Sequence, residues 1–158
     1  MLLDLLRAPW TIRAALLVTF ATLAVSVFTD LRQRRILNWV TIPALALVLG
    51  LFGIAGGWPL VKNSLIGMAV CALPMLLAAL PGWIGMGDAK LIAVCGAVAG
   101  FPAAITVLLF VTVAGGLQGA ISIAAARARR LPPPSHIPYA CSIAAGTIAA
   151  FLLPGPLP

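Results

Sequence analysis

Acidic side chains are scarce in this sequence of 158 residues, which contains no glutamate and only three aspartates, Asp4, Asp30 and Asp88. Charged residues make up 8% of the chain and hydrophobic residues 63%, whereas a typical soluble domain carries about 25% charged residues. So few charges cannot cover a water-facing globule, and a mean hydropathy of +1.16 predicts an all-α integral membrane protein. The same composition excludes a disordered chain.

Metal-binding and redox motifs are also lacking. The three cysteines, Cys71, Cys95 and Cys141, lie in apolar stretches without CxxC spacing, and the only histidine is His136. We therefore expect no metal site and no cofactor. The net charge of +7 does not predict a nucleic-acid partner, because the basic residues lie in short clusters between long apolar runs. Such clusters are typical of loops that flank membrane spans.

The long apolar runs predict a single transmembrane domain over residues 1–158, with about six helices and no soluble domain. A spanning helix needs about 20 mostly apolar residues. The expected spans are residues 14–28, 39–57, 64–80, 89–99, 103–126 and 137–153. Pro81 and three glycines between residues 81 and 88 predict a loop or irregular entry before the fourth span.

Basic residues divide unequally between the two sides of this six-span arrangement. Seven fall on one side, namely Arg32, Arg34, Arg35, Lys90, Arg127, Arg129 and Arg130. Three fall on the other side, namely Arg7, Arg13 and Lys62. Because positive residues are retained preferentially in the cytoplasm, we expect the first set to face the cytoplasm. Asp30 and Asp88 then lie at that face, whereas Asp4 is expected to be solvated near the N-terminus.

The two aspartates at span ends suggest a specific chemistry. An ionisable group near the hydrocarbon is costly and is a functional hypothesis by default. Two adjacent carboxyl groups tend to share one proton, so that one can activate water while the other polarises a peptide carbonyl. The alternative is structural: Asp30 could pair with Arg32 and Asp88 with Lys90. A non-enzymatic transport or assembly subunit could use the acids in that way.

Two short motifs surround these aspartates. Residues 30–38 read DLRQRRILN, and residues 85–90 read GMGDAK. The pair resembles the two signature segments of the type 4 prepilin peptidase family, Asp-x-Arg with Ile and Asn following, then Gly-x-Gly-Asp-x-Lys. Pro138-Tyr139, followed by Ile143-Ala144 and Gly146, is similar to the family's last helix, so the resemblance extends over nearly the whole chain.

The resemblance implies a role for each motif residue. Asp30 and Asp88 would be the catalytic aspartates, and the supporting residues would be Arg32, Asn38, Gly85, Gly87 and Lys90. Glycine permits a close backbone approach, which a peptide entering beside Asp88 would need. Arg32 and Lys90 could tune the aspartates or simply anchor the loops. Asn38 is expected to be structural, as a helix cap or a partner of a loop carbonyl.

The larger bacterial members carry a cytoplasmic segment with paired CxxC motifs and also methylate the new N-terminus. This sequence lacks that segment and is similar to the short peptidases of tight-adherence (Flp) pilus systems. The resemblance implies a multi-pass protein of the bacterial inner membrane without methyltransferase activity. It also implies a prepilin substrate, cut after a glycine behind a short basic leader at the cytoplasmic face, with pilus assembly proteins and lipid as further partners. A related enzyme acting on other membrane peptides stays open.

Overall fold

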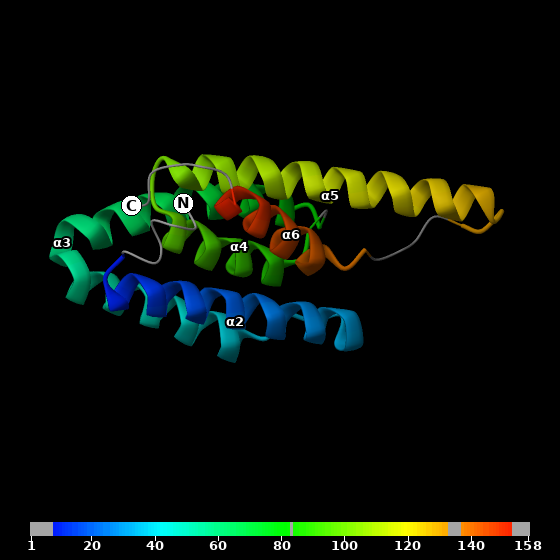
Figure 1. The fold of residues 1–158 in the computed structure, drawn as a ribbon. Helices are drawn as coiled ribbons and strands as arrows, with labels where there is room; N and C mark the ends of the chain where they lie inside the picture. Colours follow the sequence, from blue (N-terminus) through cyan, green and yellow to red (C-terminus); the bar gives the residue numbers. More distant parts are fainter. Residues whose placement is uncertain (1–7, 83, 133–136, 153–158) are drawn as a thin grey trace.

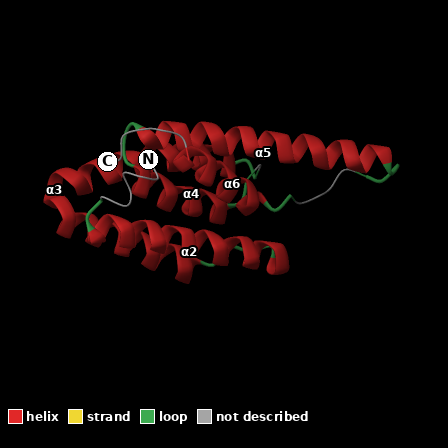
Figure 2. Cartoon of the chain, in the orientation of Figure 1, coloured by secondary structure: helices red, strands yellow, loops and turns green. Residues whose placement is uncertain are grey.

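The computed structural model describes residues 8–82, 84–132 and 137–152. Asp4, Arg7 and His136 lie outside the described residues, as does Leu153 at the end of the sixth expected span. Within the described part, the chain is mainly helical (Figure 2). The helices are α2 (Trp10–Gln33), α3 (Asn38–Ala79), α4 (Met86–Ala99), α5 (Ala103–Ala128) and α6 (Tyr139–Leu152).

The described part of the chain therefore holds five helices, and the predicted count of six is wrong. The second and third predicted spans are joined in α3, which has 42 residues and a non-helical backbone at Gly57 (φ 63°, ψ −153°). Glycine is essentially the only residue that adopts this conformation readily. The chain reverses direction at this bend (Figure 1). The sequence located the break, but the structure contains a helical hairpin where two helices separated by a loop were expected.

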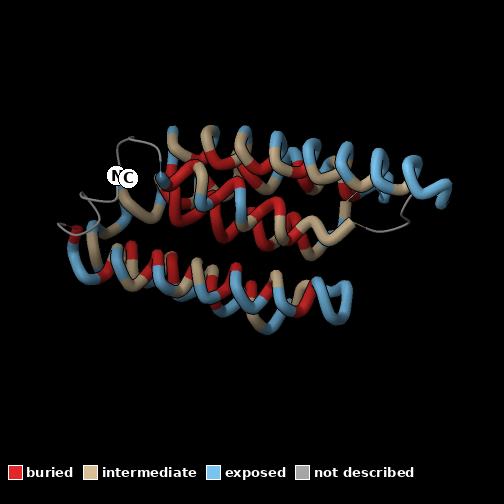
Figure 3. Tube along the Cα trace, turned by 45° about the vertical axis from the view of Figure 1, so that its right-hand side comes forward, coloured by how far each residue is buried: buried red, intermediate tan, exposed pale blue. Residues whose placement is uncertain are grey.

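Helix α4 is the centre of the molecule. Every residue from Leu91 to Ala99 is buried, and the other helices surround it (Figures 1 and 3). The hydroxyl of Ser64, in the second half of α3, donates a hydrogen bond of 2.6 Å to the carbonyl of Ala97. A helix enclosed on all sides has no polar face, which is why the sequence of α4 shows no amphipathic pattern.

Helix α2 turns a face rich in hydroxyl groups toward this centre. Thr19 and Thr22 are buried, and their hydroxyls donate to the carbonyls of Ala15 and Val18 one turn earlier. Such bonds satisfy a hydroxyl within its own helix. The helix continues beyond the predicted end of the span at residue 28 and reaches Gln33, so that Asp30 lies inside it.

The outer surface is apolar. Leu17, Leu77 and Leu117 are exposed on three different helices, and α2, α3 and α5 are long and apolar enough to cross a membrane. An apolar exterior around a core that contains hydroxyl groups suits lipid as the surrounding solvent. The molecule is built as a membrane protein.

The end of α2, the start of α4, the end of α5 and the start of α6 lie toward one end of the bundle (Figure 1). Arg127 is in the last turn of α5, and Arg32 is in the last turn of α2. Arg13, in the first turn of α2, and Lys62, shortly after the bend in α3, belong to the opposite end. The unequal division of basic residues expected from the sequence is thus present between the two ends of the molecule.

Candidate active site

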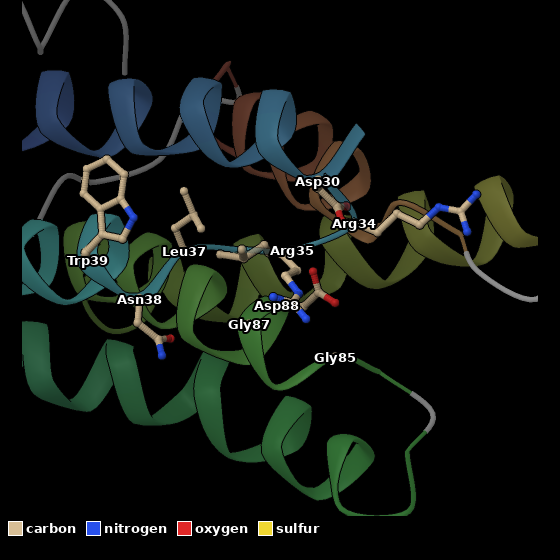
Figure 4. Close-up of a pocket in the computed structure, with 10 residues that line it drawn as sticks. Asp30, Arg34, Arg35, Leu37, Asn38, Trp39, Gly85, Gly87 and Asp88 are labelled. Atoms are coloured by element: carbon tan, nitrogen blue, oxygen red, sulfur yellow. The ribbon is translucent and has the colours of Figure 1, made fainter. Parts of the chain in front are cut away.

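A pocket of about 460 Å³ opens where α2, α4 and the segment between α2 and α3 meet. Asp30 and Asp88 both line it, although they come from different helices (Figure 4). Its other lining residues are Arg34, Arg35, Ile36, Leu37, Asn38, Trp39, Gly85 and Gly87. The volume is within the usual range of pockets that bind small ligands or a few residues of peptide.

Asp30 lies in the last turn of α2 and is only 4% exposed. The backbone N–H of Ala140, in the first turn of α6, donates a hydrogen bond of 3.2 Å to its Oδ2. The first N–H groups of a helix have no partner in their own helix and carry partial positive charge. The start of α6 therefore stabilises negative charge on Asp30, which a position at the end of α2 alone would not do.

Asp88 lies in the first turn of α4 and is 9% exposed. Its N–H donates to the carbonyl of Gly85, the N-cap residue, over 3.0 Å. The expected loop thus ends at Gly85, and Asp88 is already helical. A carboxylate in the first turn of a helix is favourably placed in the field of the helix dipole. A Cβ atom at Gly85 would lie 2.9 Å from Oδ2 of Asp88, so any other residue there would crowd that oxygen.

The two motif segments contact each other directly. A Cβ atom at Gly87 would lie 2.8 Å from the Cβ of Ile36, closer than such atoms pack. Lys90 Nζ donates a hydrogen bond of 2.9 Å to Asn38 Oδ1. Asn38 is the first residue of α3, and the N-cap position belongs to Leu37, so Asn38 is not the cap residue of this helix. The contacts of Gly87 and Lys90 fix the start of α4 against the segment that follows Asp30.

Three arginines near Asp30 have different surroundings. The guanidinium of Arg32 lies 4.6 Å from the centre of the Phe28 ring, and Arg32 does not line the pocket. Arg34 and Arg35 do line it. In Figure 4 the side chain of Arg35 extends toward Asp88, and that of Arg34 extends away from both acids. From the sequence, Arg34 and Arg35 were expected only as basic residues of a loop.

The backbone at Arg34 explains why these two arginines reach the pocket. Arg34 ends α2 in the left-handed conformation, with φ 53°, which is uncommon for residues other than glycine. The chain turns there and passes the start of α4 through Ile36. The sequence indicated a place in the pocket for Arg34 and Arg35 only through their position, since both follow Asp30 within one motif.

The arrangement places two buried carboxyl groups, two guanidinium groups and two glycines around one opening. Paired carboxyl groups in a partly dry site can divide the roles of acid and base. Among the described residues, no group of three or more His, Cys, Asp or Glu side chains could hold a metal ion. The two carboxyl groups that line the pocket are side chains that could act as acid and base.

The fold and the pocket define a helical membrane protein with two acids at one end of its bundle. The model of the type IV leader peptidase family matches residues 17–120, well over half of the sequence, and the chain belongs to this family. The match confirms the resemblance and includes Asp30, Asp88 and both motifs, but it ends before α6. No curated protein and no solved structure matches the chain.

Proposed function

We propose that the protein is an aspartic endopeptidase in which Asp30 and Asp88 act together. The observation that supports this most strongly is that the two aspartates line one pocket while both are nearly buried. Membership of a leader peptidase family supports proteolysis in general.

In the proposed reaction, one aspartate is ionised and accepts a proton from a water molecule. The other is protonated, donates a hydrogen bond to the scissile carbonyl oxygen and increases the electrophilicity of its carbon. The water oxygen attacks that carbon to give a tetrahedral intermediate. The leaving amine then receives a proton from the aspartate that took one from water, and the C–N bond breaks. Neither a covalent intermediate nor a thiol takes part.

The proposed substrate is a prepilin with a short basic leader, cut after a glycine. Gly85 would give the peptide backbone room beside Asp88, whereas Gly87 lets Ile36 pack against the start of α4. The basic residues gathered at the pocket end support a cytoplasmic position for the site, in a multi-pass protein of the inner membrane. The absence of CxxC spacing among the three cysteines supports a short, tight-adherence type of peptidase without methyltransferase activity.

The proposal is tested by co-expressing the protein with candidate small prepilins in cells that lack their own prepilin peptidase. Intact-mass analysis of each pilin should show loss of the leader, and the mass should match cleavage after the glycine without an added methyl group. Full-length precursors in every case, with the peptidase present in the membrane, would contradict it.

A further inference from the structure

The start of α6 is held by a polar side chain of α5. Gln118 Nε2 donates a hydrogen bond of 3.1 Å to the carbonyl of Pro138. The hydroxyl of Ser142 donates to Gln118 Oε1. Pro138 and Ser142 lie on either side of Ala140, whose N–H is bonded to Asp30. A single amide group thus holds the turn of backbone that contacts this aspartate.

The position of Gln118 in α5 is unusual for a polar side chain. It lines a groove of about 350 Å³ between α5 and α6 whose other walls are largely apolar, with Leu117 and Ile121 beside it. No water is available in the hydrocarbon to replace a lost partner, so polar groups there bond to the protein. An amide can donate and accept at once, which is what a carbonyl and a hydroxyl on the same turn require.

We propose that Gln118 is a positioning residue for Asp30. It fixes the first turn of α6, so that the N–H of Ala140 is directed at Oδ2 of Asp30, and it does not touch the substrate. This inference rests on the proposed function, because it assumes that Asp30 is catalytic. Through this network α5 also contributes to the site, because its Gln118 acts on the carboxyl group of Asp30 in α2 through the backbone of α6.

The test replaces Gln118 with leucine, which has a similar size and neither donor nor acceptor. We expect kcat for a purified small prepilin with a short basic leader to fall about tenfold, the loss that corresponds to one weakened hydrogen bond at the reacting group. KM should change by less than about twofold, because the substrate does not contact Gln118. Ser142→Ala should give a smaller loss, about threefold, since the bond to Pro138 remains.

The double variant Gln118→Leu/Ser142→Ala should be no worse than Gln118→Leu alone, because both changes break one network. Ser122→Ala is the matched control: Ser122 lines the same groove, but its hydroxyl bonds only to the carbonyl of Gln118 within α5. It should keep the wild-type kcat. All values are measured per folded enzyme, with folding checked by the melting temperature in detergent.

A wild-type kcat for Gln118→Leu, or independent and additive losses in the double variant, would overturn the positioning role. A rise in KM without a fall in kcat would also overturn it, since it would place Gln118 at the substrate. Asp30→Asn is assayed in parallel. If Asp30→Asn is inactive and Gln118→Leu is normal, only this inference fails; if Asp30→Asn is fully active, the proposed function fails.

Discussion

At the scale of residues, both candidate acids lie at the positively polarised N-terminus of a helix. Asp88 lies in the first turn of α4, and Asp30 accepts the N–H of Ala140 in the first turn of α6. Each helix start stabilises negative charge within about one turn. The start of α6 is therefore as much part of the site as the two signature motifs.

Gly87→Ala should reduce cleavage at least about tenfold, because a small displacement of catalytic groups has large kinetic effects. The new Cβ would lie 2.8 Å from the Cβ of Ile36, so the start of α4 would have to move away from the segment after Asp30. Gly116→Ala in α5 is the control, since a Cβ there meets nothing within 4 Å. The measurement is the rate of leader removal per folded enzyme. Equal rates for the two variants would contradict the close contact.

The sequence predicted Asp30 and Asp88 because each lies at the end of an apolar run and within one of the two motifs that resemble the family's signature segments. It did not predict Arg34 and Arg35, whose place in the pocket depends on a left-handed turn at Arg34. It also could not show the contact of Ala140, because a backbone N–H is present at almost every residue and leaves no signal in residue type.

At the scale of elements, the sequence predicted that the apolar run of α3 is interrupted. It did not predict that the interruption is a sharp bend and not a loop. The expected spans, residues 39–57 and 64–80, left an interruption between them that contains the charged residue Lys62. Whether the chain would form a loop or a sharp bend depends on one backbone conformation at Gly57. Helix ends were misplaced for a related reason: α2 continues through its charged residues to Gln33, whereas hydropathy marks only where the apolar run stops.

Gly57→Ala should destabilise the protein by about 1–3 kcal/mol, the cost of a side chain in this region of backbone space. The expected readout is a lower melting temperature in detergent. Gly50→Ala, in the first half of the same helix, should not lower it, because a Cβ there meets nothing within 4 Å and alanine favours helix. If the two variants melt at the same temperature, the bend at Gly57 is not as described.

At the scale of the whole molecule, the basic residues and the acids are gathered toward one end. The sequence predicted this separation from charge counts, because positive residues are sorted by side of the membrane. The predicted number of helices was less accurate: six were expected, and the described residues form five, of which α3 is bent. Which end faces the cytoplasm stays a prediction.

Single cysteines at Gln33 and Leu131 test that orientation, in a background that lacks the three native cysteines. Both positions are exposed, one at the end of α2 and one after α5. We expect both to resist an impermeant thiol reagent added to intact cells and to react after the cells are opened. Labelling of either position from outside would reverse the proposed topology.

The most direct test of the account is the replacement of each aspartate by asparagine, which keeps the shape and removes the acid–base chemistry. Asp30→Asn and Asp88→Asn should each abolish leader removal from a co-expressed prepilin while the protein still accumulates in the membrane. The double variant should be no worse than either single one, because the two groups act as a unit. Robust cleavage by either single variant at normal abundance would contradict the paired aspartates as the catalytic centre.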